Sequence, residues 1–206
     1  MACIFKEFFD VRKVTINANK GGAGGYTLFT PKEQYNKYAT KKFILANLIV
    51  AMGGRAAEVY HFRKNKTTNV LYSNIFRDFN DLDITTGATN DLIQANKIAR
   101  DYLTRYGFGE EFGFYDASIN SDLPFMGREM GSTSRKISES TKYDLDKEVK
   151  ELVNFAYTTS LKLIYIYEHS IEDIVEELKN QREISGTNIQ RILIGNKENQ
   201  ESNNEE

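Results

Sequence analysis

Residues 85–107 read TTGATNDLIQANKIARDYLTRYG and contain the clearest helical pattern of the chain. Apolar residues recur there at intervals of three and four, which places them on one face of an amphipathic helix. They are Leu92, Ala95, Ile98, Ala99, Tyr102, Leu103 and Tyr106. Gly107 follows at the position where a glycine often ends a helix. We therefore predict a helix over residues 89–106.

Asp91 lies on the apolar side of this predicted helix, in its first turn. Counting back from Tyr102 by four, three and four residues gives Ile98, Ala95 and then Asp91, so Asp91 lies on the same helix face as these apolar residues. One interpretation is structural: the carboxylate complements the positive end of the helix dipole, typically contributing about 1 kcal/mol or less. Thr86, Thr89 or Asn90 would then supply the cap. The other interpretation is that Asp91 is a metal ligand, and the pattern alone favours the structural one because acids in first turns are common.

Composition predicts one helix-rich domain and excludes several classes of function. The 206 residues are 40% hydrophobic and 27% charged, which suffices for one sizeable core. The net charge of -2 predicts no nucleic-acid partner. A single cysteine, Cys3, excludes an intramolecular disulfide framework and a cysteine-based zinc cluster. The longest apolar run, residues 43–52, is too short to cross a bilayer and the start lacks a signal-peptide pattern, so we expect a soluble chain.

Two strands and several helices are expected elsewhere. Residues 1–9 predict the last turns of a buried helix, and residues 11–17 and 26–30 predict a hairpin or two adjacent strands around a glycine-rich turn. Further helices are expected at residues 40–60, at 138–166 with Ser138 as the cap, and from Ser170 and Thr187. We read residues 61–84 as a loop and residues 196–206 as a disordered acidic tail. The predicted fold is mainly helical (α+β), with a small sheet near the N-terminus and a domain over residues 1–195.

Five short motifs occur in an order that resembles a known family. They are VTI at 14–16, GGRAAE at 53–58, TTGATNDL at 85–92, RYGF at 105–108 and FMGRE at 125–129. Together they resemble the peptidase domain of FtsH-type ATP-dependent zinc metalloproteases, over most of residues 11–193. The resemblance implies a helical peptidase fold, with Asp91 as the third zinc ligand and residues 61–84 as an insertion. It also implies unfolded polypeptide substrates, an AAA ATPase module, and assembly into a homo- or hetero-hexamer.

The sequence lacks the other ligands that this chemistry requires. A zinc endopeptidase of this type needs H-E-x-x-H, in which two histidines bind the metal and the glutamate is the general base. This sequence has no such motif, and we interpret His61 and His169 as ordinary, partly exposed histidines. In the family the motif precedes the strand that corresponds to residues 11–16, so we expect it just upstream of Met1, in a domain that is N-terminally incomplete. No catalytic residue is assigned, and this chain alone is expected to bind zinc weakly or not at all.

Two functions are compatible with these patterns. In the first, the chain is part of an FtsH-like zinc endopeptidase, carries only the third ligand and is inactive alone. In the second, it is a non-catalytic subunit, a pseudoprotease that uses the peptidase fold in oligomeric assembly. Any membrane association is expected through an FtsH-like partner or through segments outside this sequence, and no compartment is assigned.

Overall fold

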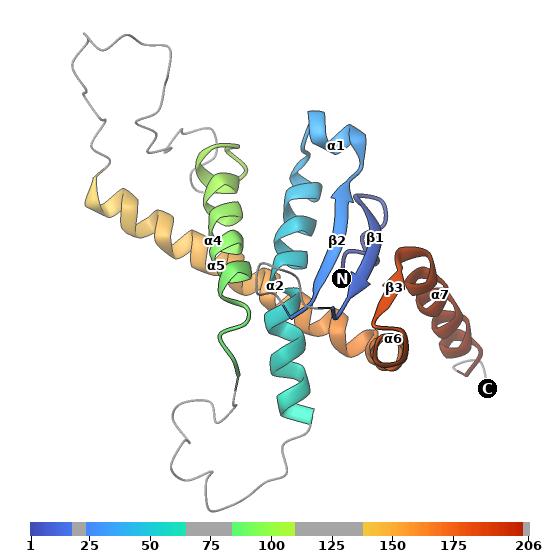
Figure 1. The fold of residues 1–206 in the computed structure, drawn as a ribbon. Coiled ribbons are helices and arrows are strands. Elements are labelled where there is room, and N and C mark those ends of the chain that lie inside the picture. The colour runs from blue at the N-terminus through green and yellow to red at the C-terminus, as the bar shows by residue number, and fades with distance from the viewer. Residues whose placement is uncertain (18–23, 65–83, 110–137, 204–206) are drawn as a thin grey trace, which may run out of the picture.

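The computed structural model describes residues 1–17, 24–64, 84–109 and 138–203, with side chains described as far as residue 196. These residues form six helices and a three-stranded sheet (Figure 1). In chain order they are β1 (Phe9–Thr15), β2 (Tyr26–Pro31), α1 (Glu33–Lys37), α2 (Lys41–Lys64), α4 (Thr89–Thr104), α5 (Glu139–Ile166), α6 (Glu168–Gln181), β3 (Glu183–Ser185) and α7 (Gly186–Asn203). The predicted class, mainly helical with a small sheet near the N-terminus, is confirmed.

Helices α2, α4 and α5 pack against one another and form the main core. Figure 1 shows α5 crossing behind α2 and α4. Ala95 and Ala99 on α4 and Ala156 on α5 are fully buried, and such small side chains let helix backbones approach closely. The buried Ser160 hydroxyl on α5 donates to the Ile49 carbonyl of α2 at 2.8 Å, so this polar group is satisfied inside the core.

Helix α2 is the central element of the fold. Within the described part of the chain it is the one helix long and apolar enough, by length and composition, to cross a membrane. Half of that stretch is buried inside the fold, against α4 and α5. It is therefore a core helix of this fold, and it contains the apolar run at residues 43–52.

The sheet is antiparallel with the order β2-β1-β3, so the predicted hairpin is confirmed and β2 lies at an edge. The pairing of β1 with β2 shifts register between Val11 and Lys13. The alternation of residues 11–17 predicts Val14 and Ile16 on one face and Lys13 and Thr15 on the other, but Thr15 is 2% exposed and Ile16, which follows the end of β1, is 39% exposed. The Thr15 hydroxyl donates to the Arg182 carbonyl at 3.1 Å, which satisfies it in this buried position.

A cluster of aromatic rings joins the sheet to α2. Phe9 of β1 is 1% exposed and packs against Phe29 of β2 and Phe43 of α2. Tyr35 of α1 stacks on Phe43, with ring centroids 5.2 Å apart. Because aromatic side chains bury a large apolar area, this cluster fixes the sheet on the N-terminal half of α2.

A second, smaller core attaches α6, β3 and α7 to the sheet. Leu178, Ile184 and Ile189 are buried together, and Val14 of β1 packs against them. Strand β3 pairs with β1 beside this cluster. Strand β3 was not predicted from the sequence, because a strand of only three residues shows no recognisable alternation. We call α6, β3 and α7 together the C-terminal unit.

Several predicted boundaries differ from the structure. Residues 2–8 form turns rather than a helix, α6 begins at Glu168 rather than Ser170, and α2 continues to Lys64 into the predicted loop. Helix α7 extends to Asn203, into the stretch where the composition predicts a tail. Residues 65–83 and the FMGRE motif lie outside the described residues. The insertion and the domain boundary therefore stay predictions.

Candidate metal centre

Asp91 lies in the first turn of α4, as predicted. The predicted caps are wrong: the N-cap residue is Ala88, and no side chain makes a cap hydrogen bond. The Thr89 hydroxyl instead donates to the Thr86 carbonyl at 2.6 Å. The first turn of α4 is therefore held by contacts with the preceding loop and with α2.

The Asp91 carboxylate lies directly against α2, at Gly54. A Cβ atom added to Gly54 would be 2.9 Å from Asp91 Oδ2. Burial raises the pKa of the Asp91 carboxyl group above its usual range. Among the described residues, no hydrogen bond or ion pair offsets this loss of solvation. A bound cation would offset this loss of solvation, and an aspartate oxygen is an ordinary zinc ligand.

An ion pair on α2 holds the loop that leads into α4. Arg55 Nη1 lies 2.8 Å from Glu58 Oε2, and both side chains are less than a fifth exposed. Arg55 also donates to the Thr85 carbonyl at 3.1 Å, and the Thr85 N–H donates to Glu58 Oε1 at 2.7 Å. We call Arg55, Glu58 and Thr85 the α2 clamp. It brings the GGRAAE and TTGATNDL motifs, about thirty residues apart, into direct contact.

The α2 clamp shifts the pKa of Glu58. Hydrogen bonds from Thr85, first from its side chain and then from its backbone, and the Arg55 charge hold the pKa of this carboxyl below its ordinary value. Glu58 is therefore ionised at neutral pH and is a structural group rather than a candidate acid. One signal for the α2 clamp is visible in the sequence, because Arg55 and Glu58 are opposite charges three residues apart in a mostly apolar stretch.

Met1 lies beside this site. A Cβ atom added to Gly53 would be 2.8 Å from Met1 Cγ. Gly53 and Gly54 are neighbours on α2, so Met1 and Asp91 lie against adjacent residues of one helix. The start of this sequence and the candidate ligand are thus close in space although they are ninety residues apart in the chain.

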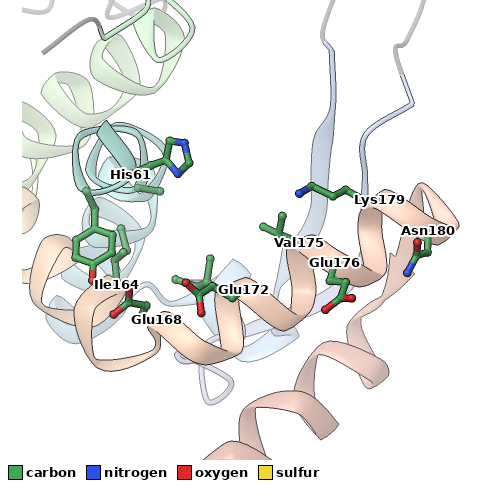
Figure 2. Close-up of a pocket in the computed structure, with 11 residues that line it drawn as sticks. His61, Ile164, Glu168, Glu172, Val175, Glu176, Lys179 and Asn180 are labelled. Atoms are coloured by element: carbon green, nitrogen blue, oxygen red, sulfur yellow. The ribbon is translucent and has the colours of Figure 1, made fainter. Parts of the chain in front are cut away.

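The two histidines lie elsewhere, and both are exposed as predicted. His61, near the end of α2, lines an open cleft of about 710 Å³ between α2 and α6. Figure 2 shows His61 on one side of this cleft, with Glu168, Glu172 and Glu176 along α6 on the other. His169 Nδ1 lies 3.7 Å from Glu172.

Asp91 does not line this cleft. In the described ranges, no three His, Cys, Asp or Glu side chains are close enough together to hold a metal ion. The described part of the chain therefore brings one candidate zinc ligand to the site, Asp91, which fits a single position of a three-ligand centre.

Strand β2 presents a free backbone edge. It pairs with β1 on one side, and no strand of the described residues pairs with its other side. Tyr26 and Leu28 on this strand are 39% and 42% exposed. Such an edge offers unpaired N–H and C=O groups to an extended peptide.

Comparison with known proteins agrees with the arrangement of these motifs. The model of peptidase family M41 matches residues 1–192. The chain is 31% identical over 183 residues to an ATP-dependent zinc metalloprotease FtsH of Chloroflexus aggregans, covering 89% of this chain and 25% of that protein. It is 31% identical over 185 residues to an ATP-dependent zinc metalloprotease FtsH of Rhodococcus erythropolis, covering 90% of this chain and 19% of that protein. A chloroplastic FTSH of Medicago sativa is 27% identical over 199 residues, covering 96% of this chain and 25% of that protein.

The chain thus spans about a quarter or less of the length of these relatives. The family match extends over nearly the whole sequence and includes both α2 and α4, which carry the candidate ligand and its neighbours. The chain therefore belongs to peptidase family M41, as an FtsH-type peptidase domain.

Proposed function

We propose that this chain is part of an FtsH-type zinc endopeptidase and supplies the third zinc ligand, Asp91. The observation that carries the proposal is that Met1 and Asp91 lie against the adjacent glycines of α2. Residues that precede Met1 in a longer chain would therefore lie near the Asp91 carboxylate. An H-E-x-x-H segment placed there would complete a site of three protein ligands and one glutamate base.

The residues of this chain have limited roles in that chemistry. When bound, zinc polarises a peptide carbonyl and lowers the pKa of a bound water. Asp91 would hold the metal through a carboxylate oxygen, and the α2 clamp would keep the start of α4 in place. In this proposal the acid–base chemistry belongs to the glutamate of an H-E-x-x-H segment outside this sequence and to none of the residues that the structure describes.

The first prediction concerns zinc and this 206-residue chain. We expect the isolated chain to bind zinc weakly or not at all and to lack peptidase activity, because one carboxylate does not make a zinc site. Elemental analysis after dialysis and a casein assay measure both properties. Asp91→Ala should then change the free energy of unfolding by about 1 kcal/mol or less. Stoichiometric zinc that disappears in Asp91→Ala would contradict the prediction, and His61 would be the next residue to test.

The protein in its native host tests the proposed function itself. Mass spectrometry of its N-terminus shows whether an H-E-x-x-H segment precedes residue 1. With that segment present, the purified protein should contain zinc, Asp91→Ala should lose it, and Asp101→Ala on the same helix should retain it. A protein that begins at Met1, contains no zinc and still joins an FtsH-like oligomer would support the alternative, a non-catalytic assembly subunit.

The proposed partners follow from the family. The relatives are named ATP-dependent proteases, and this chain matches only a part of each. We propose that it works with an AAA ATPase module that unfolds polypeptides, within a homo- or hetero-hexamer. Substrate would reach the site as an extended chain.

The second prediction is that β2 binds this extended chain by adding a strand to the sheet. Amide hydrogen exchange at residues 26–30 should slow when an unfolded polypeptide such as reduced, alkylated casein is present. Strand β3 at the opposite edge is the internal control, and its amides should be unaffected. If the exchange rates of the β2 amides are the same with and without the polypeptide, β2 does not bind substrate in this way.

A further inference from the structure

We infer that Gly54 is a positioning residue for the Asp91 ligand. Its lack of a side chain leaves the space in which the Asp91 carboxylate lies against α2. The inference rests on the proposed role of Asp91 in zinc binding and adds a residue that acts on that ligand without touching the metal.

The contact is specific to Asp91. Asp91 Oδ2 is the one atom of the described residues that a Cβ at Gly54 would meet within 4 Å, apart from the chain neighbours and the local helix backbone. The separation of 2.9 Å is shorter than Cβ contacts in real proteins, so a side chain here would force a shift. A glycine in the middle of a 24-residue helix lowers helix stability relative to alanine. The structure offers one reason for a glycine at this position: without a Cβ atom, residue 54 leaves room for the Asp91 carboxylate to lie against α2.

The side chain of Asp91 is the group that would move. Its carboxylate is the free end of a flexible side chain, whereas the backbone around it is fixed on two sides. The α2 clamp holds Thr85 at the entrance to α4, and Ala95 and Ala99 bury the next turns against the core. A methyl group at position 54 should therefore rotate Asp91 about χ1 and leave α2 and α4 in place. Metal ligands depend on neighbours that set their direction, so this rotation matters for binding.

Gly53 provides the matched control. It is the adjacent residue on the same helix, and a Cβ there would meet the Met1 side chain at 2.8 Å instead of Asp91. Gly53→Ala and Gly54→Ala thus make the same chemical change one residue apart. They differ in which side chain they displace.

The test compares these two variants in the 206-residue chain by NMR. The χ1 angle of Asp91, from its three-bond couplings, should change in Gly54→Ala and stay as in the wild type in Gly53→Ala. The melting temperature of Gly54→Ala should be unchanged or raised by up to about 4 °C, since alanine favours the helix. A purely structural glycine would instead lower the melting temperature and leave the Asp91 rotamer as it was. An unchanged Asp91 rotamer in Gly54→Ala would overturn the inference.

A second measurement separates this inference from the proposed function. In the zinc-bearing protein, competition with a chelator gives the zinc dissociation constant of each variant. Gly54→Ala should weaken zinc binding about 10- to 100-fold, the range found when a neighbour of a metal ligand is lost. If Asp91→Ala leaves affinity unchanged, the proposed function fails. If Asp91→Ala abolishes binding while Gly54→Ala has no effect, the proposed function stands and the role of Gly54 fails.

Discussion

Gly186→Ala is expected to destabilise the domain by about 3 kcal/mol or more, which is the largest effect we predict for a single methyl group. A Cβ atom at Gly186 would overlap the backbone carbonyl of Val11. Val11 lies in β1, the central strand of the sheet, where it pairs with Phe29 of β2, and the pairing of β1 with β3 begins two residues later, at Lys13. That backbone therefore has little freedom to move, and the strain should break the contact between β1 and β3.

The measurement is urea unfolding together with hydrogen exchange at residues 183–185. Gly195→Ala is the matched control, because Gly195 lies in the same helix and a Cβ there meets no atom within 4 Å. The control should be neutral or stabilising by up to about 1 kcal/mol. Equal unfolding midpoints for Gly186→Ala and the wild type would show that β1 accommodates the methyl group and that our account of this contact is wrong.

The features that sequence predicted best are set by local chemistry. Ser138 caps α5 as expected, with its hydroxyl accepting from the Thr141 N–H at 3.1 Å. Gly107 has a φ of 62°, the left-handed conformation that glycine adopts readily, although α4 ends at Thr104 with Arg105 as its C-cap residue, two residues before the predicted end. Both signals involve residues within a few positions of one another. They can be read from the chain before any tertiary contact is known.

The features that sequence missed depend on distant partners. Strand β3 exists because Ile184 is buried against β1, about 170 residues earlier in the chain. Arg182, with a φ of 62°, ends α6 in a conformation usually left to glycine. Its carbonyl accepts from the Ile16 N–H at 3.0 Å, so a contact with the end of β1 accompanies the unusual backbone. Three residues with no periodicity give no local sign of this arrangement.

The candidate site was predictable only in part, for the same reason. The resemblance of TTGATNDL identified Asp91, and the spacing placed it in the first turn of a helix. The pairing of Asp91 with Gly54, and of Thr85 with Glu58, needed the packing of α2 against α4. Glycines in the middle of a helix usually allow close packing, but the sequence alone does not show which side chain lies against Gly53 or Gly54.

Glu58→Gln is the second prediction with a large effect, and we expect it to destabilise the domain by about 1–2 kcal/mol at pH 7. Hydrogen bonds to charged groups typically contribute about 1.5–3 kcal/mol, and glutamine keeps part of the contact with Thr85. The loss is expected because Arg55 is only 14% exposed and would remain without its carboxylate partner. Chemical denaturation measures it, and α4 should lose protection from hydrogen exchange before α5 does, because the α2 clamp contacts the loop leading into α4.

The effect should depend on pH in a defined direction. Hydrogen bonds from Thr85 and the charge of Arg55 lower the pKa of Glu58 in the folded state below its ordinary value of 4.5. A carboxyl group with a lowered folded pKa stabilises the fold fully above its unfolded pKa, and this contribution is lost as pH falls through the folded pKa. The stability difference between wild type and Glu58→Gln should therefore be constant from about pH 8 to 5 and shrink as the pH falls below the ordinary value of 4.5.

Glu139→Gln supplies the comparison for this pH dependence. Glu139 and Lys142 form an ion pair with the same three-residue spacing, 2.7 Å long, but with side chains 88% and 46% exposed. Exposed pairs of this kind contribute about 0.5 kcal/mol or less, so Glu139→Gln should change stability little at any pH. If Glu58→Gln behaves like Glu139→Gln, the α2 clamp does not hold the entrance to α4. The position of Asp91 would then depend on the packing of Ala95 and Ala99 alone.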